Sequence, residues 1–134
     1  MSLDIYLSDP TATYEAATLF ESNITHNLNT MAEKAGLYDP LWRPYRIIAK
    51  AENVILHESD HEAEYEYEEF SRVTSNDIVD LVQKGLDKLK SDPEYFKKYN
   101  APNGWGVYEN LVEFTEEYLK ALKEYPEAII QVSR

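Results

Sequence analysis

Two segments of the chain carry apolar residues at helical spacing, and they constrain the fold more than any other feature of the sequence. Residues 76–90 follow Thr74 and Ser75, which can cap a helix, and residues 107–124 precede Pro126, which stops one. The stripes consist of Ile78, Leu81, Val82, Gly85, Leu86 and Leu89 in the first segment and of Val107, Leu111, Phe114, Tyr118 and Leu122 in the second. These patterns predict two long helices, with a short helix beginning at Pro93 between them.

The two ends of the chain have the composition of strands. Residues 3–7 alternate and are rich in strand-forming side chains, and residues 128–132 form a second short apolar run. For residues 14–21, Ala and Glu favour a helix, whereas the short gap after the first strand favours a hairpin partner. We interpret this segment as a strand and leave the helix as the alternative.

A further helix is predicted after this segment, and an extended connection after the helix. Ile24, Leu28, Met31, Ala32 and Ala35 share one helical face, and Gly36 lies where a glycine commonly ends a helix. Residues 37–45 contain two prolines, which predict an extended segment that inserts Trp42 into the core.

Residues 46–57 and 63–73 are interpreted as the two strands of an acidic β-hairpin that turns near Ser59 and Asp60. Tyr65 and Tyr67 alternate with glutamates, which places tyrosines on one face and carboxylates on the other. With no linker or repeat in residues 1–134, we expect one α+β domain with this hairpin inserted at about 46–73. Its small, mostly antiparallel sheet would be packed by about three helices.

The net charge of −12 is concentrated in one segment, because residues 52–69 contain eight acidic side chains and no Lys or Arg. Direct binding to nucleic acid is not expected, since that requires clustered basic side chains. An acidic surface instead suits docking on a basic protein partner.

The absence of cysteine excludes disulfides, a thiolate zinc site and a cysteine nucleophile. No apolar run is long enough to cross a membrane, and no basic leader begins the chain. We therefore expect a soluble cytoplasmic protein without a cofactor, either a monomer or a homodimer.

Residues 57–61 match the His-Glu-x-x-His pattern of zinc hydrolases, in which two imidazoles lie one helical turn apart and the glutamate activates a water. His57, Glu58 and His61 are therefore weak candidates for a metal site. Ser59 and Asp60 favour turns over helices, so the alternative is a solvated hairpin turn.

His26 and Arg43 are candidates for acid–base chemistry and for anion binding, respectively. Asn23 and Asn27 flank His26 with amides, and a histidine in a polar setting can move a proton or bind a ligand. Arg43 stands between Trp42 and a proline, so its guanidinium could clamp a carboxylate or a phosphate. The alternatives are an ordinary hydrogen bond of His26 and an ion pair of Arg43 with a glutamate of the protein.

The loop before the last predicted helix is the remaining candidate. Asn103 begins an Asn-Gly-Trp-Gly turn, and its exposed amides at a helix start could cradle an anion. The other interpretation is a tight turn that docks Trp105 into the core.

Five motifs together resemble a family of small uncharacterised proteins of bacteria and their phages. They are Ser-Leu-Asp-Ile-Tyr-Leu (2–7), Asn-Ile-Thr-His-Asn-Leu (23–28), Leu-Trp-Arg-Pro (41–44), Asn-Gly-Trp-Gly-Val-Tyr-Glu (103–109) and Val-Ser-Arg (132–134). The resemblance implies no catalytic residue, because the family has no established activity. It marks residues 43–74 as a variable insertion, and it marks His26, Asn27, Trp42, Arg43, Asn103, Trp105, Tyr108 and Glu109 as motif residues.

These observations favour a non-enzymatic binding or interaction module, such as a phage or prophage accessory protein. Its ligand would be a small molecule near His26, Arg43 and the 103–109 loop, or a protein partner at the acidic segment. The alternative is a small hydrolase or transferase with His26 as acid or base and Arg43 as anion clamp. A zinc hydrolase using residues 57–61 is the third hypothesis.

Overall fold

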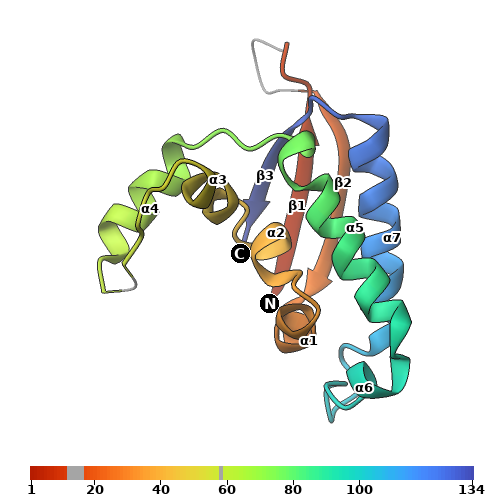
Figure 1. The fold of residues 1–134 in the computed structure, drawn as a ribbon. Coiled ribbons are helices and arrows are strands. Elements are labelled where there is room, and N and C mark those ends of the chain that lie inside the picture. The colour runs from red at the N-terminus through yellow and green to blue at the C-terminus, as the bar shows by residue number, and fades with distance from the viewer. Residues whose placement is uncertain (12–16, 58) are drawn as a thin grey trace.

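The computed structural model describes residues 1–11, 17–57 and 59–134. Its three strands are β1 (Ser2–Ser8), β2 (Thr18–Thr25) and β3 (Ile129–Ser133), arranged in the order β2-β1-β3 with both pairs antiparallel. The helices are η1 (His26–Leu28, a 3₁₀ turn), α1 (Asn29–Lys34), α2 (Tyr38–Trp42), α3 (Tyr45–Ala51), α4 (His61–Phe70), α5 (Ser75–Ser91), α6 (Pro93–Lys97) and α7 (Tyr108–Glu124). The α+β class and the small antiparallel sheet are therefore confirmed (Figure 1).

The helices cover one face of the sheet. Alternate residues of β1 point to that face, and Leu3, Ile5 and Leu7 are fully buried there. Asp4 and Tyr6 point to the opposite face and are half-buried. In Figure 1 α5 and α7 run alongside the strands, whereas α3 and α4 stand beyond the outer edge of β3. The core therefore lies between β1 and the pair α5–α7, and α4 extends away from it.

The two long helices form as the sequence predicts. Thr74 precedes α5, and its N–H and hydroxyl both donate to Asp77, which stabilises the first turn. The apolar stripes of α5 and α7 are buried against each other and against the sheet. Gly85 allows Leu37 to approach α5, because a Cβ at this position would lie 2.3 Å from the Leu37 Cδ2 atom.

The predicted acidic β-hairpin is wrong, because its two halves are the helices α3 and α4. Asp60 caps α4 by accepting the N–H of Ala63. Glu64 and Glu68, one helical turn apart, both face arginines of the body. A Glu-Tyr alternation over five residues has strand period, but glutamate is a good helix former, and these distant partners select the helix.

The predicted start of the first helix and the predicted extended segment are also wrong. Ile24 belongs to β2, and the first helix begins as η1 only after Thr25, whose hydroxyl accepts the N–H of Asn27. Residues 37–45 are not extended, since α2 accommodates Pro40 inside its short length. Trp42 is nevertheless in the core, with 2% of its surface exposed, as predicted.

Strand β2 agrees in part with the interpretation of residues 14–21. Residues 18–21 are in the strand, and residues 14–16 lie outside the described part of the chain. The short helix at Pro93 and the final strand are confirmed as α6 and β3. Within the described residues, no helix combines the length and the apolarity that a membrane span needs.

Candidate functional site

His26 and Trp42 meet where η1 contacts α2. The indole Nε1 of Trp42 donates to Nδ1 of His26 over 2.9 Å, so Nδ1 carries no proton and the neutral ring holds its proton on Nε2. On its other side Trp42 stacks on Tyr38, with ring centroids 5.8 Å apart and nearly parallel planes. His26 thus makes the ordinary hydrogen bond that was one of its two predicted roles.

Arg43 follows Trp42 and donates to two tyrosines. Its Nε donates to the Tyr38 hydroxyl and its Nη1 to the Tyr45 hydroxyl, each over 3.1 Å. Partial burial acts against the charge, but these hydrogen bonds outweigh it and hold the pKa of the Arg43 guanidinium above its ordinary value. No ion pair joins Arg43 to a glutamate of the described residues, so the expected pairing is replaced by tyrosines.

Tyr45 connects Arg43 to α4. The Tyr45 hydroxyl donates to Glu64 over 2.5 Å, and Arg46 donates to the same carboxylate over 3.0 Å and 3.2 Å. The hydrogen bond from Tyr45, together with those from Arg46, lowers the pKa of the Glu64 carboxyl below its ordinary value against the effect of partial burial. Glu64 is therefore an anionic anchor that holds α4 on α3.

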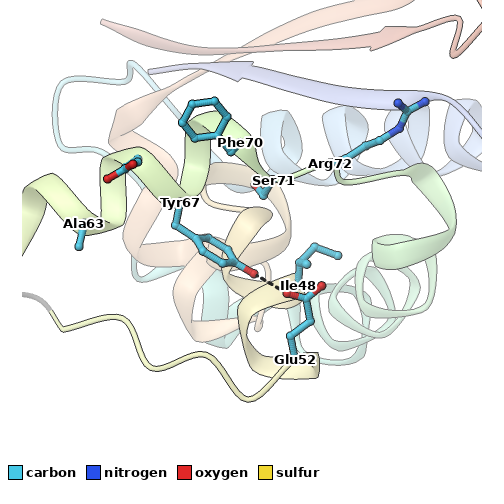
Figure 2. Close-up of a pocket in the computed structure, with 8 residues that line it drawn as sticks. Ile48, Glu52, Ala63, Tyr67, Phe70, Ser71 and Arg72 are labelled. Atoms are coloured by element: carbon cyan, nitrogen blue, oxygen red, sulfur yellow. Dashed lines mark hydrogen bonds between the residues drawn. The ribbon is translucent and has the colours of Figure 1, made fainter.

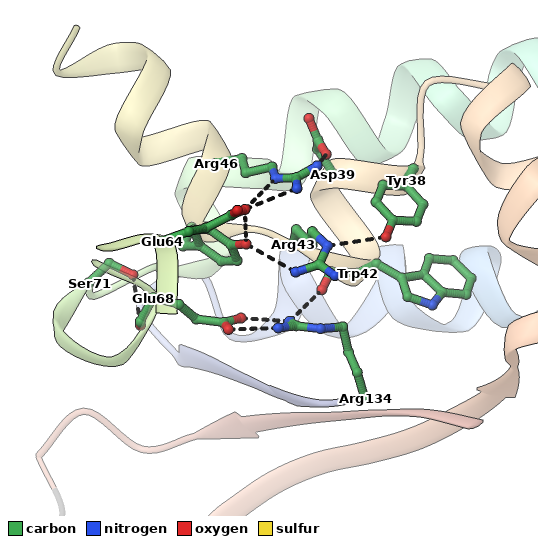
Figure 3. Close-up of polar contacts among 10 residues, drawn as sticks. Tyr38, Asp39, Trp42, Arg43, Arg46, Glu64, Glu68, Ser71 and Arg134 are labelled. Atoms are coloured by element: carbon green, nitrogen blue, oxygen red, sulfur yellow. Dashed lines mark hydrogen bonds and ion pairs between the residues drawn. The ribbon is translucent and has the colours of Figure 1, made fainter. Parts of the chain in front are cut away.

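Arg134 supplies a second anchor, as Figure 3 shows. Its two terminal nitrogens donate to the two carboxylate oxygens of Glu68, each over 2.6 Å, and one of them also donates to the main-chain carbonyl of Trp42 over 3.0 Å. A bidentate pair of this kind fixes orientation as well as distance. The end of the sheet, α2 and α4 are thereby joined at one point.

The loop before α7 is rigid and presents Trp105 to solvent. The N–H of Trp105 donates to the side chain of Asn103, and its carbonyl accepts from the side chain of Asn27 over 2.8 Å. Gly106, with φ of 119°, lies against η1, where a Cβ would be 3.0 Å from the Thr25 methyl. The expectation that this turn docks Trp105 into the core is wrong, since 74% of its surface is exposed.

Two of the amides at the start of α7 are already bound by asparagine side chains. The N–H of Val107 donates to Asn110, and the N–H of Tyr108 donates to Asn100. The Tyr108 hydroxyl donates to the carbonyl of Leu89, which ties α7 to the end of α5. Asn side chains thus occupy two of the amides that a bound anion would use.

Besides Arg43 and Tyr108, two candidates make no hydrogen bond to the other candidates within the described chain. Glu109 is exposed and lies 3.8 Å from the Lys97 ammonium, and Asn23 is exposed on β2 opposite Asp4. Hydrogen bonds thus join His26 to Trp42 in one group and Asn27 and Asn103 to Trp105 in another, and Arg43 contacts Tyr38, which stacks on Trp42.

The zinc-hydrolase pattern does not form the helix that it requires. His57 precedes α4 in a turn in which the N–H of Asp60 donates to the His57 carbonyl, and α4 begins only at His61. The glutamate of the pattern, Glu58, lies outside the described part of the chain. Among the described residues, no group of three or more His, Asp or Glu side chains is placed to hold a metal ion.

Sequence reasoning missed the residues that position α4. Arg46, Glu64 and Glu68 lay in the segment predicted as a hairpin, and Tyr38 and Tyr45 in the segment predicted as extended. Arg134 was noted only as part of the terminal Val-Ser-Arg motif. A search of residues 61–70 for acidic pairs four residues apart would have found two such pairs, Glu62 with Glu66 and Glu64 with Glu68, without showing which of them is anchored.

Comparison with protein-family models, with curated proteins and with solved structures finds no match to this chain.

Proposed function

We propose that the protein is a non-enzymatic interaction module and that α4 binds a basic segment of a partner protein. The observation that carries the proposal is the position of α4. None of its residues is buried, yet two of its glutamates are anchored to arginines of the body. This helix is thus a fixed surface and differs from a loosely solvated acidic tail.

The outer face of α4 is negative and free to meet a partner. Glu62, Glu66 and Glu69 lie at i, i+4 and i+7, on the face opposite the anchors. No ion pair joins these three side chains to a basic residue of the described chain. A partner with clustered Lys or Arg would neutralise them, and the charge would also speed the encounter.

An apolar groove accompanies this charge. It lies between α4 and α3 with a volume of about 500 Å³, and Figure 2 shows Tyr67 reaching across it to Glu52 and Phe70 at its end. Phe70 is 78% exposed and Tyr65, on the other side of α4, is 68% exposed. Large exposed aromatic side chains beside unpaired carboxylates are typical of a docking surface for a segment that is both basic and apolar.

The enzymatic alternative has less support. The Nδ1 atom of His26 is occupied by Trp42, and the Arg43 guanidinium is occupied by two tyrosines. For acid or base chemistry His26 therefore has only its Nε2 atom available. Arg43 would have to break its hydrogen bonds to the two tyrosine hydroxyls before it could bind an anion.

Selection of peptides from a displayed random library on the immobilised protein tests the proposal. We expect enriched peptides to combine Lys or Arg with an aromatic or aliphatic residue. The triple substitution Glu62→Gln, Glu66→Gln and Glu69→Gln, which neutralises the outer face, should lower the affinity of these peptides about tenfold. This factor assumes a contribution of about 0.5 kcal/mol from each exposed charge pair. Phe70→Ser should also lower the affinity of the peptides, and the fold should stay intact because Phe70 is exposed.

Helix α7 provides a matched control. Glu113, Glu117 and Glu124 also share one exposed helical face and also form no ion pair within the described chain. Their replacement by Gln changes the net charge by the same amount and should change the affinity by less than about twofold. Equal losses in the two triple variants, or enriched peptides without basic residues, would overturn the proposal.

A second candidate surface surrounds Trp105. Its exposed indole is held by a hydrogen-bonded loop, and rigidly presented tryptophans are frequent centres of binding energy. A protein partner that used this surface would lose affinity with Trp105→Ala and keep it with the α4 triple variant. Library peptides that are insensitive to Trp105→Ala would remove this candidate.

A further inference from the structure

Strand β3 lies at the edge of the sheet, and its outer side is only partly paired. The N–H of Ile130 donates to the carbonyl of Val73 over 2.9 Å, and the N–H of Ser75 donates to the carbonyl of Ala128 over 3.0 Å. These two bonds attach the segment before α5 to the beginning of β3. They leave the second half of the same edge without a neighbouring strand.

The direction of the free groups follows from the register. Since the N–H of Ile130 points away from β1, the main-chain groups of Val132, two residues further on, point the same way. Within the described residues, no backbone hydrogen bond reaches Val132 from that side. The Ile130 carbonyl and both main-chain groups of Val132 are therefore an open template for another strand.

A groove of about 720 Å³ runs along this edge. Its walls are β3 from Ile129 to Arg134, α4 at Tyr65, Glu68 and Glu69, and the start of α3 at Pro44 and Tyr45. Figure 1 shows α4 standing beyond β3 instead of on the sheet face, so that the groove lies in the direction in which the sheet would grow. A further strand would lie about 4.8 Å from β3.

We propose that this edge accepts an extended segment of a partner protein as a fourth strand, and that the segment carries Lys or Arg at positions from which the long side chain reaches Glu69 of α4. This inference rests on the proposed function and adds the binding mode. Main-chain hydrogen bonds to Ile130 and Val132 would supply affinity, and the contacts of alternate side chains would supply specificity.

Charge identifies the occupant. The groove contains two carboxylates and one guanidinium, and Arg134 is already paired with Glu68, which leaves Glu69 to meet an incoming cation. A second copy of this chain is a poor occupant, since pairing of two β3 edges would bring together two α4 helices, each with five glutamates and no Lys or Arg. With α4 as its outer wall, the groove also restricts growth of the sheet beyond the added strand.

The probe for this inference is the capped octapeptide acetyl-(Lys-Val)₄-amide, whose binding is followed together with amide hydrogen exchange of the full chain. At a peptide concentration about ten times the dissociation constant, exchange of the Val132 amide should slow about tenfold, since only about a tenth of the sites stay open. The Ile130 amide is the internal control, because it is already bonded to Val73 and should not change.

Two N-methylated versions of the peptide test the period of the contact. Only every second N–H of an added strand faces β3, so methylation of the Lys amides and methylation of the Val amides should have very different effects. One version should lose binding and the other should retain it. Equal losses, or an unchanged Val132 amide in the bound state, would overturn strand addition.

The outcomes separate this inference from the proposed function. Peptide binding that is weakened by the α4 triple variant but shows no protection of Val132 would refute the strand and leave the function standing. Binding that is insensitive to the α4 triple variant would refute the function. Failure to bind at about 1 mM, the weak limit of specific association, or a dimer that excludes the peptide would overturn the strand proposal.

Discussion

Removing the contact between Arg134 and Glu68 should loosen α4 without unfolding the body. The guanidinium makes two hydrogen bonds of 2.6 Å to the carboxylate and a third to the Trp42 carbonyl. Because α4 buries none of its residues, little apolar packing opposes its detachment. The change is Arg134→Gln, combined in a double-mutant cycle with Glu68→Gln.

The magnitude follows from the exposure of the two side chains. A fully exposed pair contributes about 0–1 kcal/mol, and a buried hydrogen bond to a charge contributes about 1.5–3 kcal/mol. With 24% and 23% of the two side chains exposed, this pair lies between those limits, so we expect a coupling energy of about 1–2 kcal/mol. That energy corresponds to exchange of the α4 amides that is faster by about tenfold.

The assay is amide hydrogen exchange, with α5 as the internal reference because its amides report on the core. Arg72→Gln is the control of equal charge, since Arg72 is exposed and forms no ion pair within the described residues. A coupling energy below about 0.3 kcal/mol, or equal effects of Arg72→Gln and Arg134→Gln on α4, would refute this account of how α4 is held.

Three further predictions concern the core and the pH dependence of α4. Gly85→Ala should lower the free energy of unfolding by about 1–2 kcal/mol, because the clash with buried Leu37 exceeds the gain of about 1 kcal/mol in helix propensity. Tyr118→Phe should raise it by about 1 kcal/mol, since the buried hydroxyl has no hydrogen-bond partner among the described residues. The Glu64 anchor should hold above the ordinary carboxyl pKa of 4.5 and weaken as the pH falls through the lower pKa of the folded state, so that the protection of the α4 amides, measured against their intrinsic exchange rates at each pH, decreases in acid.

Each of these has a direct check. Urea unfolding measures the two core variants, and a Gly85→Ala protein that is more stable than the parent would show that Leu37 can move aside. A destabilised Tyr118→Phe protein would show that the hydroxyl is bonded after all. For the pH dependence, Glu64→Gln removes the titrating group, so a variant with the same acid response as the parent would assign that response elsewhere.

The sequence predicts the two long helices and the two terminal strands correctly. Helices α5 and α7 carry apolar stripes over several turns, and β1 and β3 have strand composition next to clear turn residues, so local and tertiary preferences agree. Helix α4 was misread because five residues of Glu-Tyr alternation fit a strand, while the arginines that select the helix lie 18 and 66 residues away in the chain.

The candidate site was predictable in part, for a related reason. The motifs mark His26, Trp42 and Trp105 as a group to examine, but the main-chain carbonyls of Trp42 and Trp105 accept hydrogen bonds from side chains distant in the sequence. Spacing along the chain contains no information on such contacts. The exposure of Trp105 was missed because tryptophan is usually buried.

The way in which α4 is attached also makes the protein a scaffold on which one helix can be replaced by another. Arg46 and Arg134, which lie outside α4, bind Glu64 and Glu68, and these two glutamates are one helical turn apart in α4. Other ten-residue helices that keep this pair of acids should dock in the same place. The remaining positions of α4 can then diversify under selection, or in a designed library, while the three strands and the two long helices remain as they are.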